Sequence, residues 1–139
     1  MIGLARCQSG ETSDTLAAGE LSKSRGAFIY GMCNVVGSSV ARATDSGTYI
    51  HVGPEIGVAS TKAFTGQVTV LVMMAMMIAR LKGRIDTERY ESVLRGLLAM
   101  PEKIKEILSQ ADRIKEVAAI YTYARNFLYP DRGCNYPTT

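Results

Sequence analysis

Short apolar runs alternate with amphipathic segments along the first half of the chain. Residues 2–5 and 27–33 are nearly continuous in apolar side chains, which is typical of parallel strands covered on both faces. Between them, apolar residues recur at helical spacing from Thr12 until Gly26, which ends the predicted helix. A third, short strand is predicted over residues 48–51. This order predicts parallel pairing of the strands with right-handed crossovers.

The second half of the chain has the spacing of helices. A long helix is predicted from about residue 60 to residue 81, and another amphipathic helix begins near Thr87. Pro101 suits the first turn of a further helix, and Asp112 is a candidate cap for the next one. Residues 126–129 are predicted to begin another strand. The fold class that follows is α/β, with a parallel sheet in a partial three-layer α/β/α arrangement followed by linking helices.

The most apolar stretch of the chain, residues 68–79, lies inside the long predicted helix. A helix that spans a membrane needs about 20 apolar residues, so this stretch predicts a buried core helix and no membrane partner. Its methionines, at positions 73, 74, 76 and 77, favour an adaptable core or a subunit interface over a cofactor site.

Composition and charge exclude several classes of protein. The chain has 139 residues, 47% of them hydrophobic and 21% charged, which is typical of about one globular domain. The net charge of +3 comes from interleaved basic and acidic residues, so we expect no nucleic-acid partner.

Cysteine and histidine usage points to a reducing compartment. The three cysteines, Cys7, Cys33 and Cys134, are widely spaced and odd in number, and His51 is the only histidine. This pattern suits neither a disulfide framework nor a zinc site, so we predict free thiols, no metal and no cofactor. The first residues lack the apolar core of a signal peptide, which favours a cytoplasmic location.

The loop after the first predicted strand carries candidate chemistry. In parallel sheets, ligands bind beyond the carboxyl ends of the strands. Ser9 and Thr12 supply hydroxyl groups, Gly10 allows close approach of the backbone, and the following helix presents its positive end. These features predict a cradle for a phosphate monoester, and the absence of a lysine after the glycine excludes a nucleoside triphosphate loop. The alternative is a plain helix cap with Thr12 at the N-cap position.

The loop before the long helix leaves several alternatives open. Glu55 is either a functional carboxylate or an acid that favours the start of the helix, which Ser60 or Thr61 could cap. Lys62 either helps to hold an anion or lies on the surface. His51 is interpreted as the end of a strand rather than an acid–base group.

Three segments carry a resemblance to a known family. Residues 8–16 (QSGETSDTL) resemble the phosphate loop of sugar isomerase (SIS) domains. Residues 33–39 (CNVVGSS) and, most specifically, residues 53–65 (GPEIGVASTKAFT) resemble the isomerase region of the glutamine–fructose-6-phosphate aminotransferase family. The likeness runs from about residue 2 to residue 137 and implies a partial SIS-type fold.

The resemblance also implies which residues contact a ligand. The implied set, for the phosphate and the body of the sugar, is Cys7, Gln8, Ser9, Thr12, Val58 and Ser60. Cys7 stands where the family normally has a serine that touches phosphate, and a thiol is a poorer hydrogen-bond donor than a hydroxyl. The resemblance places every catalytic residue of the family outside this chain.

For the whole chain, the resemblance implies a partial first SIS domain over residues 1–110. Residues 111–139 are then a linking helix and the truncated start of a second SIS domain. The implied function is binding of fructose 6-phosphate or glucosamine 6-phosphate in amino sugar biosynthesis, by a chain that is inactive alone. The alternative is a non-catalytic SIS-type module that only binds sugar phosphates. The full-length family protein is expected to be a homo-oligomer.

Overall fold

The computed structural model describes residues 1–56 and 60–128. The chain divides into two compact units, Met1–Glu91 and Ser92–Thr139. The first unit holds the sheet, and each unit is considered by itself.

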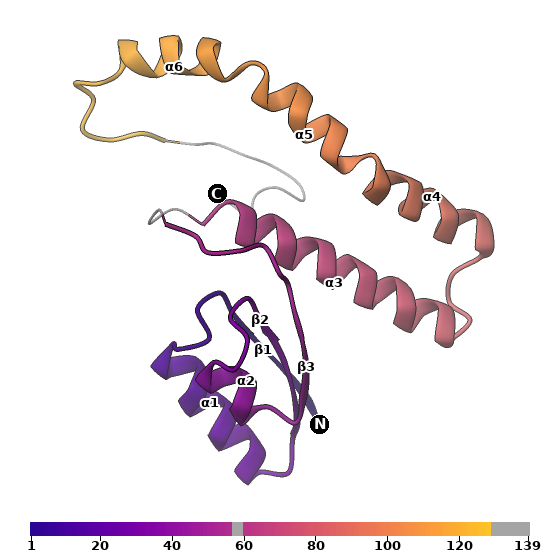
Figure 1. Ribbon diagram of the computed structural model, residues 1–139. Helices are drawn as coiled ribbons and strands as arrows, with labels where there is room; N and C mark the ends of the chain where they lie inside the picture. The colour runs from indigo at the N-terminus through magenta and orange to yellow at the C-terminus, as the bar shows by residue number, and fades with distance from the viewer. Residues whose placement is uncertain (57–59, 129–139) are drawn as a thin grey trace. The chain divides into compact units, whose positions relative to one another are not determined.

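A three-stranded parallel sheet forms the centre of the first unit, in the order β1 (Ile2–Cys7), β2 (Phe28–Cys33) and β3 (Ser46–Tyr49). The register of β1 and β2 runs from Ile2 opposite Phe28 to Cys7 opposite Cys33. All three carboxyl ends therefore lie at one edge of the sheet (Figure 1). The predicted α/β class and the parallel pairing are confirmed.

The third strand lies two residues earlier than predicted. It covers Ser46–Tyr49 instead of residues 48–51, because the backbone N–H of Ile50 makes a last bond to the carbonyl of Cys33 at 3.0 Å and the chain then turns. Asp45 fixes the start of the strand, since its carboxylate accepts the N–H of Ile29 at 2.7 Å and pairs with Lys23 at 2.9 Å.

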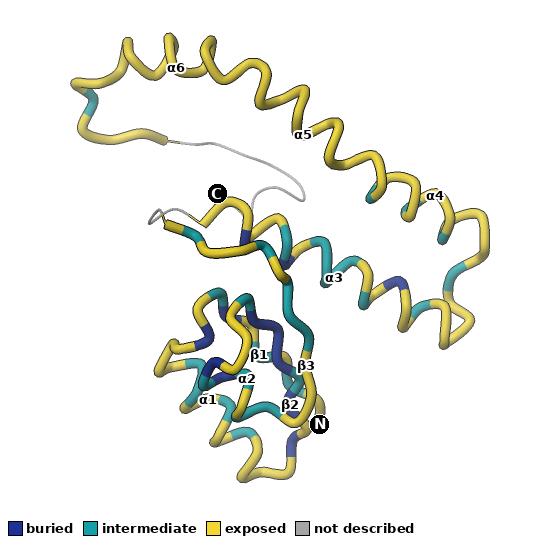
Figure 2. Tube along the Cα trace, in the orientation of Figure 1, coloured by how far each residue is buried: buried dark blue, intermediate teal, exposed yellow. Residues whose placement is uncertain are grey.

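Two helices, α1 (Ser13–Ser24) and α2 (Ser39–Ala43), pack against the strands. The buried residues at this contact are Cys7, Cys33 and Val40, and among the three strands β2 carries most of the buried residues (Figure 2). Gly26, with φ of +78°, follows the last turn of α1 and donates its N–H to the carbonyl of Lys23, as its predicted role as a helix stop requires.

The long helix α3 (Lys62–Leu81) is far less buried than the sequence predicts. Its buried residues are Ala63, Gln67 and Met76, and 11% of its most apolar window is buried. The core-helix prediction is therefore wrong for the part of the chain that the structure describes. The length argument fails too, because the helix has 20 residues and by length and composition alone could cross a membrane.

Three shorter helices follow, α4 (Thr87–Leu98), α5 (Met100–Leu108) and α6 (Ala111–Ile120). Pro101 lies in the first turn of α5, as predicted. The predicted cap at Asp112 is wrong, because the N-cap residue is Gln110 and Asp112 lies in the first turn of α6. No strand forms over residues 126–128, and Tyr129 lies outside the described residues.

Candidate functional site

The carboxyl edge of the sheet brings two loops together, residues 8–12 after β1 and residues 50–56 after β3. Asn34, at the end of β2, bonds to both of them. Its backbone N–H donates to the carbonyl of Gln8 at 3.3 Å, and its side-chain amide donates to the carbonyl of Gly53 at 2.7 Å. Its side-chain oxygen also accepts the N–H of Val52 at 3.1 Å. Asn34 has no predicted role from the sequence, although a lone amide after an apolar strand is a usable signal.

Cys7, the last residue of β1, contacts the first loop through its sulfur. Its Sγ accepts the N–H of Gly10 at 3.1 Å and lies 3.0 Å from the Thr12 hydroxyl and 3.7 Å from the Ser9 hydroxyl. Gly10 has φ of +74°, and a Cβ there would sit 2.0 Å from the Oγ of Ser38, so only glycine fits this turn. The residue expected to be a weak donor to phosphate is thus an acceptor that shapes the loop.

The same loop is tied to α2. The carbonyl of Gly10 accepts the N–H of Val40 at 2.8 Å, and the carboxylate of Glu11 accepts the N–H of Ser39 at 2.8 Å. The loop is therefore held from both sides, by the sulfur of Cys7 within it and by α2 outside it.

The N-cap residue of α1 does not cap the helix with its own side chain. Thr12 occupies the N-cap position with extended backbone, yet its side chain makes no capping bond and its hydroxyl lies beside Cys7 instead. Ser9 accepts the N–H of Glu11 at 3.2 Å. The predicted N-cap position of Thr12 is therefore confirmed, but its side chain does not act as the cap. The first-turn N–H groups and the positive end of the helix dipole remain available to an anion.

The two buried thiols of this edge differ in acidity. Burial is the largest influence on Cys7 and acts to raise its pKa. Hydrogen bonds from Thr12, Ser9 and Gly10 together outweigh it, so the pKa of Cys7 lies below its ordinary value. The pKa of Cys33 is raised, chiefly by burial and further by the neighbouring Cys7. Cys7 is therefore the more readily ionised thiol of the two.

Two cavities flank the loop. The first, of about 400 Å³, is lined by Arg6, Cys7, Gln8, Thr12, Thr15, Ser60, Phe64 and Gln67. The second, of about 540 Å³, is lined by Gln8, Ser9, Asn34, Val35, His51, Gly53, Pro54 and Glu55. The structure thus brings Cys7, Gln8, Thr12 and Ser60 together around one cavity. Ser9 faces the neighbouring one, and Val58 lies outside the described residues.

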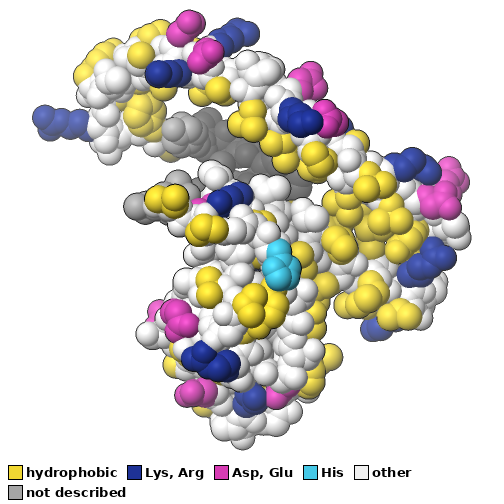
Figure 3. Space-filling view, in the orientation of Figure 1, with side chains coloured by type: hydrophobic (Ala, Val, Ile, Leu, Met, Phe, Trp, Pro, Cys, Tyr) yellow, Lys and Arg dark blue, Asp and Glu magenta, His cyan; other side chains and the backbone are white. Residues whose placement is uncertain are grey.

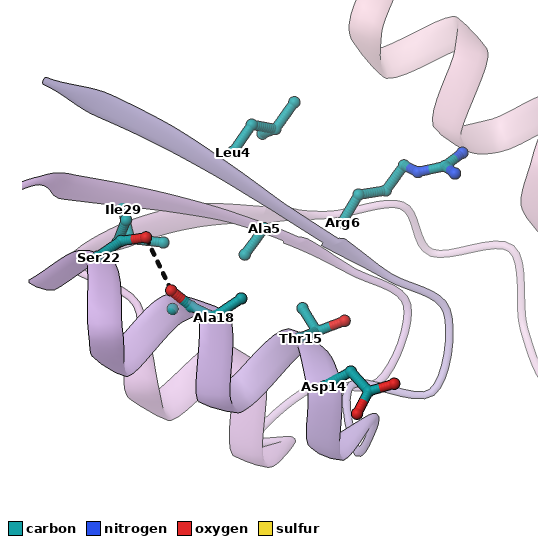
Figure 4. Close-up of a pocket in the computed structure, with 9 residues that line it drawn as sticks. Leu4, Ala5, Arg6, Asp14, Thr15, Ala18, Ser22 and Ile29 are labelled. Carbon is teal, nitrogen blue, oxygen red and sulfur yellow. Dashed lines mark hydrogen bonds between the residues drawn. The ribbon is translucent and has the colours of Figure 1, made fainter.

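Arg6 is a further residue of the first cavity, and one for which the sequence predicts no role. Figure 4, drawn on a third cavity beside α1, shows Ala5 directed toward that helix and Arg6 on the opposite side of β1. There the guanidinium of Arg6 donates to the side-chain oxygen of the buried Gln67 at 3.0 Å. A charged residue next to the end of an otherwise apolar strand is the signal that could have found it.

Glu55 caps the N-terminus of α3. One carboxylate oxygen accepts the N–H of Thr61 at 2.7 Å and that of Lys62 at 3.1 Å, and the other accepts the hydroxyl of Ser60 at 2.8 Å. The bond from Ser60 is the largest influence on its pKa, which lies below the ordinary value. The structural interpretation of Glu55 is thus confirmed. Thr61 occupies the N-cap position, as one of the two predicted alternatives has it, but its side chain makes no capping bond. Lys62 lines neither cavity.

His51 lies at a sharp turn after β3. Its φ is +50°, and its ring packs edge-to-face on Tyr49 with centroids 5.9 Å apart. The side chain is exposed (cyan in Figure 3) and lines the second cavity. Its predicted place at the end of a strand is wrong, because β3 ends at Tyr49, two residues before it.

Comparison with known proteins shows the family of the chain. The model of the SIS domain family matches residues 1–77. The chain belongs to the SIS domain family. Its expected SIS-type fold and its resemblance to glutamine–fructose-6-phosphate aminotransferases are thereby confirmed. The predicted boundary near residue 110 stays a prediction.

Similar proteins cover nearly the whole chain. It is 61% identical over 136 residues to the glutamine–fructose-6-phosphate aminotransferase (isomerizing) of Bacteroides thetaiotaomicron, covering 98% of this chain and 22% of that protein. It is 47% identical over 131 residues to glutamine–fructose-6-phosphate aminotransferase (isomerizing) 2 of Homo sapiens, covering 94% of this chain and 19% of that protein. The chain therefore spans about a fifth of the length of these relatives.

A solved structure agrees with the fold. The C-terminal domain of glucosamine-fructose-6-phosphate aminotransferase from Francisella tularensis superposes with a TM-score of 0.92 at 31% identity. The match covers 98% of this chain and 39% of that domain. The arrangement of strands and helices described above is thus that of an SIS domain in an enzyme of this name.

Proposed function

We propose that this chain supplies the phosphate-binding loop of a sugar-phosphate site, in a protein that acts as a glutamine–fructose-6-phosphate aminotransferase. The single observation that carries the proposal is the N-terminus of α1, where Thr12 at the N-cap position makes no capping bond and lines the first cavity. A phosphate monoester supplies the negative charge that this end of a helix favours. The names of the similar proteins support fructose 6-phosphate as the ligand. The resemblance in sequence adds glucosamine 6-phosphate.

Each lining residue has a role in this proposal. The phosphate accepts hydrogen bonds from the first-turn N–H groups of α1 and from the hydroxyls of Ser9 and Thr12. Gln8, which lines both cavities, bonds to the sugar between them, and Ser60 contacts the sugar from the start of α3. Arg6 adds a positive charge that offsets the charge of the phosphate. Val58 belongs to the proposed set by resemblance alone.

A non-catalytic binding module is the second candidate, and the state of Glu55 favours it. A general base must be free to take a proton from the substrate. Glu55 already accepts three hydrogen bonds at the start of α3, and these keep it ionised and occupied. Transfer of nitrogen and isomerisation are therefore proposed for the longer protein, and binding alone for this chain.

Association with a second copy and a cytoplasmic location complete the proposal. The apolar side chains of α3 are largely exposed in the described structure, among them Met73, Met77 and Leu81. A second copy would cover such a face, and light scattering of the purified chain without detergent measures that association. The free thiols of Cys7 and Cys33 suit a reducing compartment.

Calorimetry with glucosamine 6-phosphate tests the binding site. The double change Ser9→Ala with Thr12→Ala should weaken binding by much more than about tenfold, because each lost hydrogen bond to a charged group costs about 1.5–3 kcal/mol. The matched control is Ser109→Ala with Thr122→Ala, two exposed residues of the second unit. Equal affinity in the two double variants would contradict the assignment.

A further inference from the structure

Two buried thiols face each other across the strands that carry the phosphate loop. Cys7 and Cys33 are partners in the register of β1 and β2, at the last residue of each strand. Neighbouring strands lie about 4.8 Å apart, and residues directly opposite project to the same face of the sheet. This spacing lies within the range of Cα separations that a disulfide bridges.

The surroundings of the sulfurs agree with the register. Both residues belong to one buried cluster, with 7% of Cys7 and 1% of Cys33 exposed. The N–H of Gly10 donates to the sulfur of Cys7, and the position that a Cβ of Gly10 would take lies 3.8 Å from the sulfur of Cys33. Gly10 therefore lies next to both sulfurs. Both cysteines are free thiols in this structure.

We propose that Cys7 and Cys33 form a reversible disulfide when a hydroperoxide oxidises the chain, and that this bond closes the phosphate loop to its ligand. The disulfide is independent of the function proposed above, whereas its effect on binding rests on that function. Nothing in the family resemblance supplies this pair, since Cys7 stands in place of a serine.

The chemistry takes two steps. The Cys7 thiolate attacks one oxygen of the peroxide, the O–O bond breaks, and Cys7 becomes a sulfenic acid while the other oxygen leaves with a proton as water. The Cys33 sulfur then attacks the sulfur of Cys7 and gives up its proton. The S–O bond breaks and a second water leaves. Two thiols are thereby oxidised and one peroxide is reduced.

Access and reactivity single out Cys7 as the thiol that reacts first. Cys7 lines the first cavity, so a molecule as small as hydrogen peroxide reaches it from the side where the sugar phosphate is proposed to bind. Its lowered pKa raises the thiolate fraction that reacts with peroxide. Cys33 lines a different, smaller cavity beside β3, but it is only 1% exposed and its pKa is raised, so it acts as the resolving thiol.

The loop loses its internal anchor when the bond forms. In the reduced chain the sulfur of Cys7 accepts the N–H of Gly10 and lies beside the hydroxyls of Thr12 and Ser9. A sulfur bonded to Cys33 is drawn toward β2 and away from these groups. The Thr12 and Ser9 hydroxyls then leave the positions in which they are proposed to meet the phosphate.

Peptide mapping of the full 139-residue chain tests the bond itself. Trypsin places the cysteines in separate peptides, Cys7 in residues 7–23, Cys33 in residues 26–42 and Cys134 in residues 133–139. After hydrogen peroxide treatment and alkylation, we expect residues 7–23 linked to residues 26–42, and the link removed by dithiothreitol. Consumption of Cys7 without that linked pair, or a dominant link to Cys134, would overturn the inference.

Calorimetry with glucosamine 6-phosphate tests the consequence. Oxidation should weaken binding by at least about tenfold, and dithiothreitol should restore it. In Cys33→Ala no resolving thiol is present, so peroxide oxidises the sulfenic acid of Cys7 further to a sulfinic acid. Dithiothreitol does not reduce that product, so the loss of affinity is no longer reversed. The matched control, Cys134→Ala, should keep both the link and the reversal.

The outcomes separate the two proposals. Unchanged affinity in a chain that carries the Cys7–Cys33 link would refute the switch, and so would a reversible loss in Cys33→Ala. No binding by the reduced chain, with the link still formed, would refute the proposed function and leave the disulfide standing.

Discussion

The two helices that follow the loops at the carboxyl edge of the sheet, α1 and α3, differ in how the N–H groups of their first turns are hydrogen-bonded. The N-terminus of α3 is satisfied from within the chain, because the carboxylate of Glu55 accepts two backbone N–H groups and the hydroxyl of Ser60. In the described part of the chain no carboxylate is seen to accept the first N–H groups of α1, although Asp14 lies in its first turn, and Thr12 at the N-cap position has its hydroxyl beside Cys7. An internal anion stabilises a helix, whereas a missing one leaves room for a ligand.

Giving α1 an internal anion should produce the largest effect. In Thr12→Asp the new carboxylate occupies the place proposed for the phosphate, and two like charges about 4 Å apart repel by about 4 kcal/mol near a protein surface. We expect glucosamine 6-phosphate affinity to fall by at least about a hundredfold in calorimetry. Thr122→Asp changes the net charge equally, and a similar loss in that variant would contradict the interpretation.

Removing the internal anion of α3 should have a smaller effect, on stability. Glu55→Gln keeps the size of the side chain but loses the charge that faces the N–H groups of Thr61 and Lys62. We expect a lower melting temperature by circular dichroism and weaker sugar-phosphate binding, since Ser60 loses its strongest partner. Glu116→Gln, at an exposed residue of α6, is the matched control. Equal melting temperatures in the two variants would show that Glu55 does not cap α3.

Acid should act on the same contacts more gradually. Hydrogen bonds from Ser60 and from Ser39 lower the pKa of Glu55 and of Glu11, and the bond from the N–H of Ile29 lowers that of Asp45. A carboxyl whose folded pKa is depressed adds stability above its unfolded pKa of about 4, and this stability is lost as pH falls through the folded value.

Denaturant unfolding between about pH 7 and pH 3 measures this loss. We expect stability to decline below about pH 5 and the decline to be shallower in Glu55→Gln than in Glu116→Gln. A steeper decline in Glu55→Gln would contradict the assigned direction of the Glu55 pKa.

Local sequence predicts much of this edge and misses the contacts that cross it. The apolar runs locate β1 and β2 to within two residues of their observed ends, and Gly26 marks the end of α1, because these depend on neighbours in sequence. Asn34 bonds to residues 18 and 19 positions away, and Arg6 meets Gln67 61 positions away. Side-chain pairs at such separations exist only once the sheet has formed, so the periodicity of the local sequence does not predict them.

The errors have the same origin. Residues 48–51 predict a strand, but the strand ends at Tyr49 and the chain turns at His51. Asn34 bonds to Gly53 in the loop that follows, and this contact cannot be seen in the local sequence. The apolar side chains of α3 predict burial, but whether they are covered depends on other parts of the structure and not on the sequence of the helix itself. Glu55 resembles a helix-favouring acid in sequence, and its role as the cap follows from its hydrogen bonds to Ser60, Thr61 and Lys62, which lie five to seven positions further along the chain.

The turn at Gly10 has a consequence for how a ligand is received. Its backbone is fixed by Cys7 on one side and by Val40 on the other, and Ser38 fills the space that any larger residue would need. A loop held this way is preorganised, so it loses little conformational entropy when a ligand arrives. Affinity then depends on how well the ligand fits a shape that already exists, and a small displacement of one anchor is enough to spoil that fit.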